Sequence, residues 1–372
     1  MSEETQPDTD RVVVVRDGVA FRGWTSFSTT ESIENCVSTF ELEITGVYVA
    51  AATALREDQD VQIRLGDDVL IAGVIDEVAI GGDADGLTVK VTGRSNTRDV
   101  VDCSSPLGNK SGLTLLGLVR WLVADYPIEV VDEAGVGGKI IRSWCAEEGE
   151  SIFDAIDRLG RDHAFMVTDD PQGRLVLTRA GAGGTASWGI ARGEGFLSGD
   201  VTRSCADRFS VYEIRGQEVS DLDVSVDVLG GAEDVAMRRF RKLIVRPERG
   251  LSGGDAALRA RWEATTRAAK ALEATYKLRG FRQRDGSLWR KNQTVQVVDP
   301  LCGIAGAELL VVEVTRSLSA EDGRVTVLKL APPEAYTPQP AKVDVKGYAY
   351  EEPELTDPGE LGADDLGIEG DL

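Results

Sequence analysis

The chain has 372 residues, a length that exceeds one compact core and predicts two to four domains. Its hydrophobic content of 42% and charged content of 28% are ordinary for a globular protein, and no apolar run approaches the roughly 20 residues that a membrane-spanning helix needs. The formal net charge of −22 argues against a nucleic-acid-binding surface, because such a surface concentrates Lys and Arg to displace the counterions of phosphates.

The first 95 residues have the pattern of short β-strands separated by turns. Asp17-Gly18 predicts a tight turn, and residues 40–44 alternate apolar and charged side chains with period two, which indicates a half-buried strand. This region therefore predicts a barrel or a sandwich. The expected strands are residues 12–15, 19–21, 40–44, 61–65, 69–75 and 87–91.

Composition changes after Arg94 to a small α+β unit. An amphipathic helix is expected at residues 113–123, ended by Tyr126-Pro127, and a second begins after a cap formed by Ser151 and Asp154. Two strands follow, at residues 164–167 and 175–177.

The segment 181–184 reads as a linker, since it lacks the Lys-Ser/Thr pair and the strand-to-helix context of a phosphate-binding loop. β alternation resumes at residues 209–214, and a long helix is expected at 254–276. Its apolar face comprises Leu258, Trp262, Thr265, Ala269, Leu272 and Tyr276, and strands are expected after it at residues 295–298, 308–314 and 326–330.

The C-terminal residues 336–372 combine ten acidic residues with two lysines and several prolines. Such a segment buries too little apolar surface to offset its ordering entropy, so we expect disorder in isolation. It could order on a partner, with Tyr348-Ala349-Tyr350 as the expected anchor. The N-terminus is acidic and polar, the reverse of a signal peptide, and predicts synthesis into a cytoplasm.

Catalytic and metal-binding patterns are weak throughout the chain. The single histidine, His163, lies at an expected helix end, where it serves as a C-terminal cation rather than a catalyst. Asp83, Asp85 and Gly86 begin like a calcium loop but lack its later ligands, so a hairpin turn is favoured. Paired carboxylates of a glycosidase occur by chance among 63 acidic residues. We expect no catalytic residue, no cofactor and no metal site.

The five cysteines are scattered singly without C-x-x-C spacing, which predicts small buried hydrophobes rather than disulfides or a zinc site. They are Cys36, Cys103, Cys145, Cys205 and Cys302. Together with the weak catalytic patterns, this leaves a binding or assembly protein as the favoured class.

An ordered set of segments between residues 10 and 335 resembles the baseplate hub family of Mu-like contractile-tailed phages. The resemblance begins at Asp17–Phe27 with its Gly23-Trp24 pair, and continues through residues 32–42 and 93–104. After the long helix it resumes in the segments 280–282, 286–289, 292–300, 308–311 and 323–330. We expect Trp289 to be a core aromatic, Trp24 to be a core residue or a subunit contact, and the charges between Arg94 and Asp102 to pair locally.

The resemblance implies a mainly β, multidomain chain with α+β inserts, in which two barrel-like domains per chain form a pseudo-sixfold ring in a homotrimer. The expected divisions are a first hub domain at 1–95, an α+β domain at 96–182, a second hub domain at 183–335 and the acidic extension at 336–372. Such a ring adapts the sixfold tail tube, or its initiator ring, to the threefold spike and leaves a channel for DNA. The extension is expected to meet baseplate wedge proteins.

The expected location is the tail baseplate of a virion assembled in the host cytoplasm, and the expected role is structural rather than enzymatic. Three alternatives stay open from the sequence. The chain could be the hub of a secretion or extracellular injection system, a tail-associated peptidoglycan hydrolase, or a glycan- or receptor-binding tail module.

Overall fold

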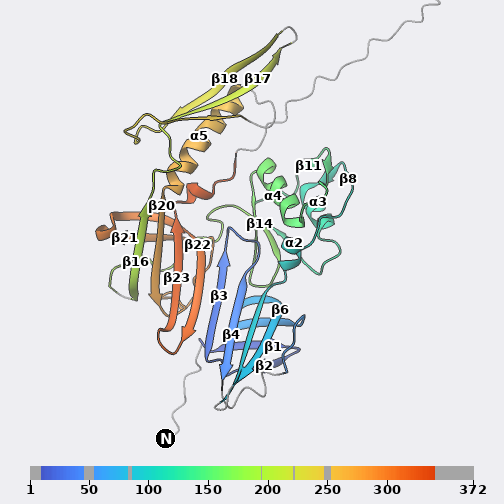
Figure 1. Ribbon diagram of the computed structural model, residues 1–372, viewed down its shortest axis with the longest axis vertical. Helices are drawn as coiled ribbons and strands as arrows, with labels where there is room; N and C mark the ends of the chain where they lie inside the picture. Colours follow the sequence, from blue (N-terminus) through green and yellow to red (C-terminus); the bar gives the residue numbers. More distant parts are fainter. Residues whose placement is uncertain are drawn as a thin grey trace, which may run out of the picture. The chain divides into compact units, whose positions relative to one another are not determined.

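The computed structural model describes residues 10–45, 54–82, 86–193, 195–220, 223–246 and 253–339. The fold is mainly β, with one long sheet and four smaller ones (Figure 1). Within the described residues, no helix combines the length and the apolarity required to cross a membrane.

The N-terminal part consists of consecutive antiparallel strands. Asp17 and Gly18, with φ of 49° and 76°, form the predicted turn between the first two strands, because both residue types tolerate the left-handed backbone that a two-residue hairpin requires. The strands are β1 Val12–Arg16, β2 Val19–Phe21, β3 Ser26–Ser32, β4 Thr39–Thr45, β5 Asp60–Leu65, β6 Asp68–Gly82 and β7 Leu87–Ser95. The predicted turn at 83–86 falls largely outside the described residues, although β6 and β7 on either side of it pair as expected.

The middle part is the predicted α+β unit. Both helices form, and the cap of the second is a capping box in which Ser151 accepts from the Asp154 backbone N–H and the Asp154 side chain accepts from Ser151. The strands β10, β14 and β13 make a small sheet in which β10 and β14 run parallel. The elements are α2 Arg98–Asp102, β8 Asn109–Lys110, β9 Leu113–Thr114, α3 Leu115–Leu122, β10 Val130–Asp132, β11 Ile140–Ile141, β12 Trp144–Cys145, α4 Ile152–His163, β13 Met166–Asp169 and β14 Leu175–Thr178.

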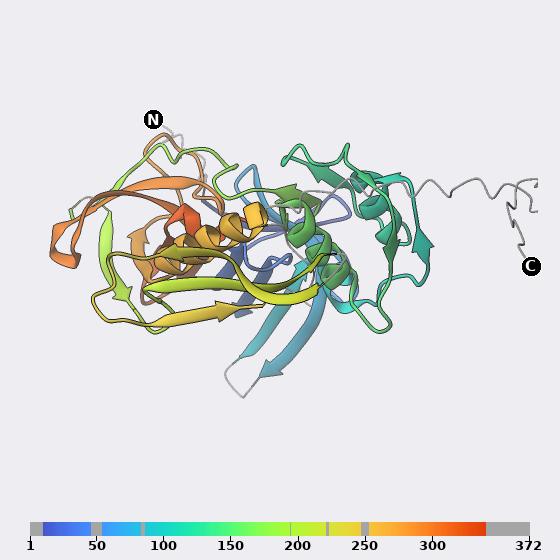
Figure 2. The same ribbon diagram turned by 90° about the horizontal axis from the view of Figure 1, so that it is seen from above.

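The C-terminal part contains the remaining strands and the long helix. Its elements are β15 Ile190–Ala191, β16 Phe196–Arg203, β17 Val211–Ser220, β18 Asp223–Glu233, β19 Lys242–Val245, α5 Gly253–Lys270, β20 Leu272–Arg279, β21 Thr294–Asp299, η2 Pro300–Cys302, β22 Ile304–Ser319, β23 Gly323–Ala331 and η3 Pro333–Tyr336. The strands β18, β17 and β19 form a separate sheet, and α5 packs against its β17–β18 pair (Figure 2).

The prediction for the long helix is wrong at its end and for most of its buried face, on which Ala269 is buried as predicted while Leu258 and Thr265 are exposed. The helix stops at Lys270, and Leu272 and Tyr276 lie in β20, where Ala274, Tyr276 and Leu278 alternate inward and both neighbouring strands supply hydrogen-bonding partners. On α5 itself Leu258 is 49% exposed. The buried residues of α5 are Ala256, Ala260, Glu263, Thr266 and Ala269. At Ala256 the strand comes so close that a Cβ on Gly230 of β18 would lie 2.5 Å from the Ala256 carbonyl carbon.

The N- and C-terminal parts share one sheet. β3 pairs antiparallel with β22, so that a single path of strands runs from β16 through β22 and β3 to β2. Two hydrophobic cores lie along this sheet. One includes Phe40 and Ile63, and the other includes Tyr276 and Trp289. Among the described residues the path has two ends, β16 and β2, and closure into a barrel is not seen.

The predicted linker at 181–184 is a packed turn. Gly181 N donates to Asn292 Oδ1 at 2.8 Å, and Gly183 N donates to Asn292 O at 3.1 Å. A Cβ at Gly183 would lie 2.8 Å from the Asn292 carbonyl oxygen, so the segment connects β14 to β15 while remaining fixed to the C-terminal part.

Candidate functional site

Three consecutive residues before β21 join the three parts of the chain. Arg290 donates to the carbonyl of Val69 at 3.0 Å, in the N-terminal part. Lys291 donates to the carbonyl of Ser32 at 3.2 Å and pairs with Asp169 of β13. The next residue, Asn292, donates to the hydroxyl of Thr178 at 3.2 Å and to the carbonyl of Arg179 at 2.9 Å, at the end of the middle part. We call Arg290, Lys291 and Asn292, together with the side chains that they bind, the junction.

A second buried ion pair joins β3 to β22, the two neighbouring strands through which the N- and C-terminal parts share one sheet. Arg316 of β22 donates to Glu31 of β3 at 2.7 Å, and both side chains are almost wholly buried. Arg316 also donates to the carbonyl of Trp289, and Arg290 lies 3.8 Å from Glu31. Burial alone would raise the pKa of Glu31, but Arg316, Arg290 and Lys291 outweigh it and hold the pKa below its ordinary value.

The Asp169 carboxylate has two roles in the junction. One oxygen accepts from Lys291, and the other accepts from the Ser38 backbone N–H at 2.9 Å. The side chain is fully buried, so removal of either charge would leave the other in a medium of low polarity. The chemistry of the arrangement is that of a connection between parts that are far apart in the sequence.

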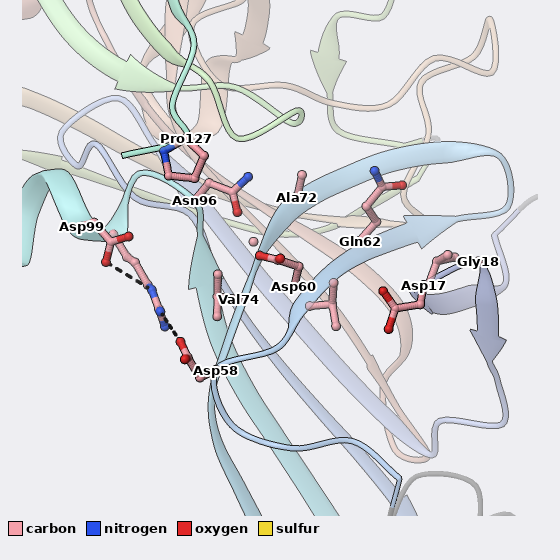
Figure 3. Close-up of a pocket in the computed structure, with 14 residues that line it drawn as sticks. Asp17, Gly18, Asp58, Asp60, Gln62, Ala72, Val74, Asn96, Asp99 and Pro127 are labelled. Carbon is pink, nitrogen blue, oxygen red and sulfur yellow. Dashed lines mark hydrogen bonds and ion pairs between the residues drawn. The ribbon is translucent and has the colours of Figure 1, made fainter. Parts of the chain in front are cut away.

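A hollow of about 690 Å³ lies beside α2, between β5, β6 and the turn after β1 (Figure 3). Four aspartates and one arginine line it, over a floor that contains Val15, Val61, Ala72 and Val74. Arg98 pairs with Asp58 at 3.2 Å and with Asp99 at 3.6 Å. We call this the acidic hollow; its charged lining residues are Asp17, Asp58, Asp60, Asp99 and Arg98.

The acidic hollow contains no serine, cysteine or histidine that could act as a nucleophile or base. The residues that the structure describes also contain no group of three or more His, Cys, Asp or Glu side chains placed to hold a metal ion. The lining is suited to recognition of a cationic group by charge, with apolar contacts beneath it.

Trp289, Trp24 and Arg94 lie in the segments that resemble the family, and the structure shows the surroundings of each. Trp289 is 1% exposed and lies in a core, as predicted. Trp24 is also buried in a core, and its Nε1 donates to the carbonyl of Phe21, in agreement with the prediction of a core residue. Arg94 pairs with Asp76 and Asp102, each at 2.7 Å, which confirms local pairing.

The predictions for histidine and cysteine have a mixed outcome. His163 is the last residue of α4, the helix end that was expected for it. All five cysteines are free, but only Cys36 is buried, while Cys145 and Cys205 are exposed. The expectation of buried hydrophobes is therefore wrong for these two, because Cys145 lies on a two-residue strand and Cys205 in a surface turn.

The junction residues were missed at the level of sequence. Arg290 and Lys291 stand in a polar stretch with no periodic pattern, and the partners that their side chains bind lie between 122 and 259 positions away. The only local signal is the placement of two cations directly after Trp289, a residue expected in the core.

Three family models match the chain in order. The description "Mu phage baseplate assembly protein GpP-like, N-terminal" matches residues 11–95, "Baseplate hub protein gp44-like, second domain" matches 97–179, and "Mu phage baseplate assembly protein GpP, fourth domain" matches 252–339. None of these three matches includes residues 180–251.

Individual proteins agree with the family models. The chain is 31% identical over 343 residues to the baseplate hub protein gp44 of Escherichia phage Mu. The matched region covers 88% of this chain and 89% of that protein. It is 26% identical to the 43 kDa tail protein of prophage MuSo2 from Shewanella oneidensis, with a TM-score of 0.76 over 88% of this chain and 99% of the other. At 12% identity and a TM-score of 0.56, an Escherichia coli component of the type VI secretion system shares the fold over 88% of this chain and 79% of its own length.

Proposed function

The chain belongs to the baseplate hub family of Mu-like phages and is a structural hub protein, and from this premise we propose that three copies close into a ring at the centre of a contractile tail baseplate. The ring receives the tail tube or its initiator ring on one side and the central spike on the other, and DNA passes through its channel. The chain performs no chemical step, and its location is the virion tail after assembly in the host cytoplasm.

The observation that carries this proposal is the connection between the two ends of the long sheet. The β3–β22 pairing makes one sheet out of strands from both ends of the chain, and the buried Glu31–Arg316 pair lies across it. A part that transmits force between tube and spike needs such a connection, because separate domains on a flexible linker would move relative to one another.

Each end of the sheet has its own hydrophobic core, and this supports two barrel-like halves per chain. Three chains would then present six similar halves to the sixfold tube and three repeats to the spike. The corresponding division is residues 1–95 and 183–335 for the two halves, 96–182 for the α+β domain, and 336–372 for an extension that meets baseplate wedge proteins.

The ends of the strand path also favour assembly. β16 pairs only with β20 and β2 only with β1 among the described residues, so both leave backbone groups without a neighbouring strand. Most of β16 is accessible to solvent, with Leu197 40% exposed. A closed assembly covers such edges, which otherwise promote aggregation.

The proposal is tested on the purified full-length chain by sedimentation velocity over a concentration series and by electron microscopy. We expect a species of three times the chain mass, and averaged images with threefold symmetry, six lobes and a central channel. A chain that remains monomeric across the series and in the presence of its tube and spike proteins would refute the ring.

Two alternatives are distinguished by other measurements. A hub of a secretion or extracellular injection system has the same fold, as the likeness to a type VI secretion component illustrates, and imaging of the particle that contains the chain separates the two. A peptidoglycan hydrolase would clear a cell-wall gel in zymography, whereas a purely structural hub would leave the gel unchanged.

A further inference from the structure

The loop between β18 and β19 is unusual in a chain of net charge −22. Residues 234–241 contain Arg238, Arg239 and Arg241 against the single acid Asp234. Phe240 is 78% exposed and Val235 is 92% exposed, which makes them two of the most exposed large apolar side chains among the described residues. We call residues 234–241 the basic loop.

The base of the basic loop is fixed, while its tip is open. Asp234 pairs with Arg208 at 2.6 Å, and Arg241 donates to the carbonyl of Ala206 at 2.8 Å and lies over the ring of Phe209. In contrast, Arg238 and Arg239 are exposed and have no ion pair with any described residue. The loop therefore presents two uncompensated cations beside an exposed aromatic ring.

The charge of the chain restricts what can cover this loop. Copies that each carry −22 repel one another, so local patches of opposite sign favour their association. A DNA backbone would neutralise the arginines but would leave Phe240 and Val235 in water. A partner surface that matches the loop combines carboxylates with an apolar floor.

The acidic hollow has both properties. Asp60 has no ion pair among the described residues. The other three aspartates pair with Arg16 or Arg98, so four carboxylates stand against two cations and the hollow keeps a negative charge. Its floor contains Val15, Val61 and Val74. A volume of about 690 Å³ lies within the range of roughly 300–1,000 Å³ that encloses a ligand of a few side chains.

We propose that the basic loop of one copy binds in the acidic hollow of the next copy, an inference that rests on the proposed ring. The two surfaces differ, so the contact is head-to-tail, and repeating it three times closes a ring. This contact alone is too small to bury the roughly 1,200–2,000 Å² of surface that a typical stable interface buries. Its role is to select the neighbouring copy and to set its orientation, while contacts between β-sheet edges bury the remaining surface.

The test compares charge reversals on each side in the full-length chain. R238D/R239D removes the uncompensated cations, and D60R/D99R reverses two aspartates of the hollow. Asp17 and Asp58 are left unchanged, because their φ of 49° and 61° favours Asp over Arg. The matched control is R120D/R261D, which changes the net charge equally at two exposed arginines outside the loop.

We expect R238D/R239D and D60R/D99R each to lower the self-association constant on the order of 100-fold. Each variant turns two attractive charge pairs into repulsive ones, and each such change lowers the constant by about tenfold or more. The fourfold variant, which exchanges the charges, should recover most of the association, and the control should associate like the unmodified chain. Circular dichroism and thermal unfolding confirm that each variant is folded.

The possible failures are distinguishable. If the unmodified chain does not self-associate, alone or with its tube and spike proteins, the proposed ring fails. If it does so and R238D/R239D behaves like the control, the ring stands and the loop–hollow contact is wrong. If R238D/R239D abolishes binding of duplex DNA but not self-association, the loop belongs to a nucleic-acid contact and the proposal is overturned.

Discussion

The substitution R316M tests whether the buried Glu31–Arg316 pair holds the sheet together. Arg316 is 1% exposed and Glu31 is 5% exposed, so the variant would leave a carboxylate buried without its nearest cation, and the Trp289 carbonyl would lose its donor. Removal of one partner from such a pair costs about 3–5 kcal/mol. With a urea dependence of about 3 kcal/mol per molar, the unfolding midpoint should fall by about 1–1.7 M.

The pH dependence of this loss has a definite sign. In the unmodified chain the pKa of Glu31 is depressed, so its contribution to stability is present above the ordinary glutamate pKa and is lost as the pH falls through the depressed value. In R316M the burial of Glu31 is opposed only by Arg290 and Lys291, and its pKa rises relative to the unmodified chain. The difference in the free energy of unfolding between the unmodified chain and R316M should therefore be largest near neutral pH. It should become smaller as the pH falls toward about 4.

The control is E31M/R316M, in which both charges are replaced by apolar side chains of similar length. This variant should unfold within about 1 kcal/mol of the unmodified chain, because no unpaired charge remains. The measurement is urea unfolding followed by tryptophan fluorescence. A neutral-pH loss below about 1 kcal/mol in R316M, or an E31M/R316M variant no more stable than R316M, would contradict this account.

Three further outcomes follow from the same structure. D169N weakens the contact of the junction with Lys291 and should lower the free energy of unfolding by about 2–4 kcal/mol, whereas D125N at an exposed position should change it by less than about 0.5 kcal/mol. G230A forces β18 away from α5 and should cost about 1–3 kcal/mol in thermal unfolding, while G231A, whose Cβ has only an ordinary contact at 3.5 Å, should cost less. Deletion of residues 340–372 should leave ring formation intact in sedimentation and weaken attachment to a neighbouring baseplate component, and unchanged attachment would reject that role of the extension.

Local patterns in the sequence were sufficient for most individual elements. The Asp17-Gly18 turn, the alternating strand at Thr39–Thr45 and the Ser151–Asp154 cap all depend on contacts within a few residues, so the determinants stand side by side in the sequence. The ordered motifs of the family were likewise visible without coordinates. The matched family models and the relative from phage Mu then showed that the chain belongs to this family.

Only the tertiary structure decided how these elements are joined. The helix α5 ends at Lys270 because the following residues find strand partners on both sides, and its buried face is the one that Gly230 can approach. The junction brings Lys291 to Asp169 across 122 positions, and Arg316 reaches Glu31 across 285. Local periodicity indicates which face of a strand is buried, as at Thr39–Thr45. The identity of a distant partner depends on strand pairing, and strand pairing exists only in the folded chain.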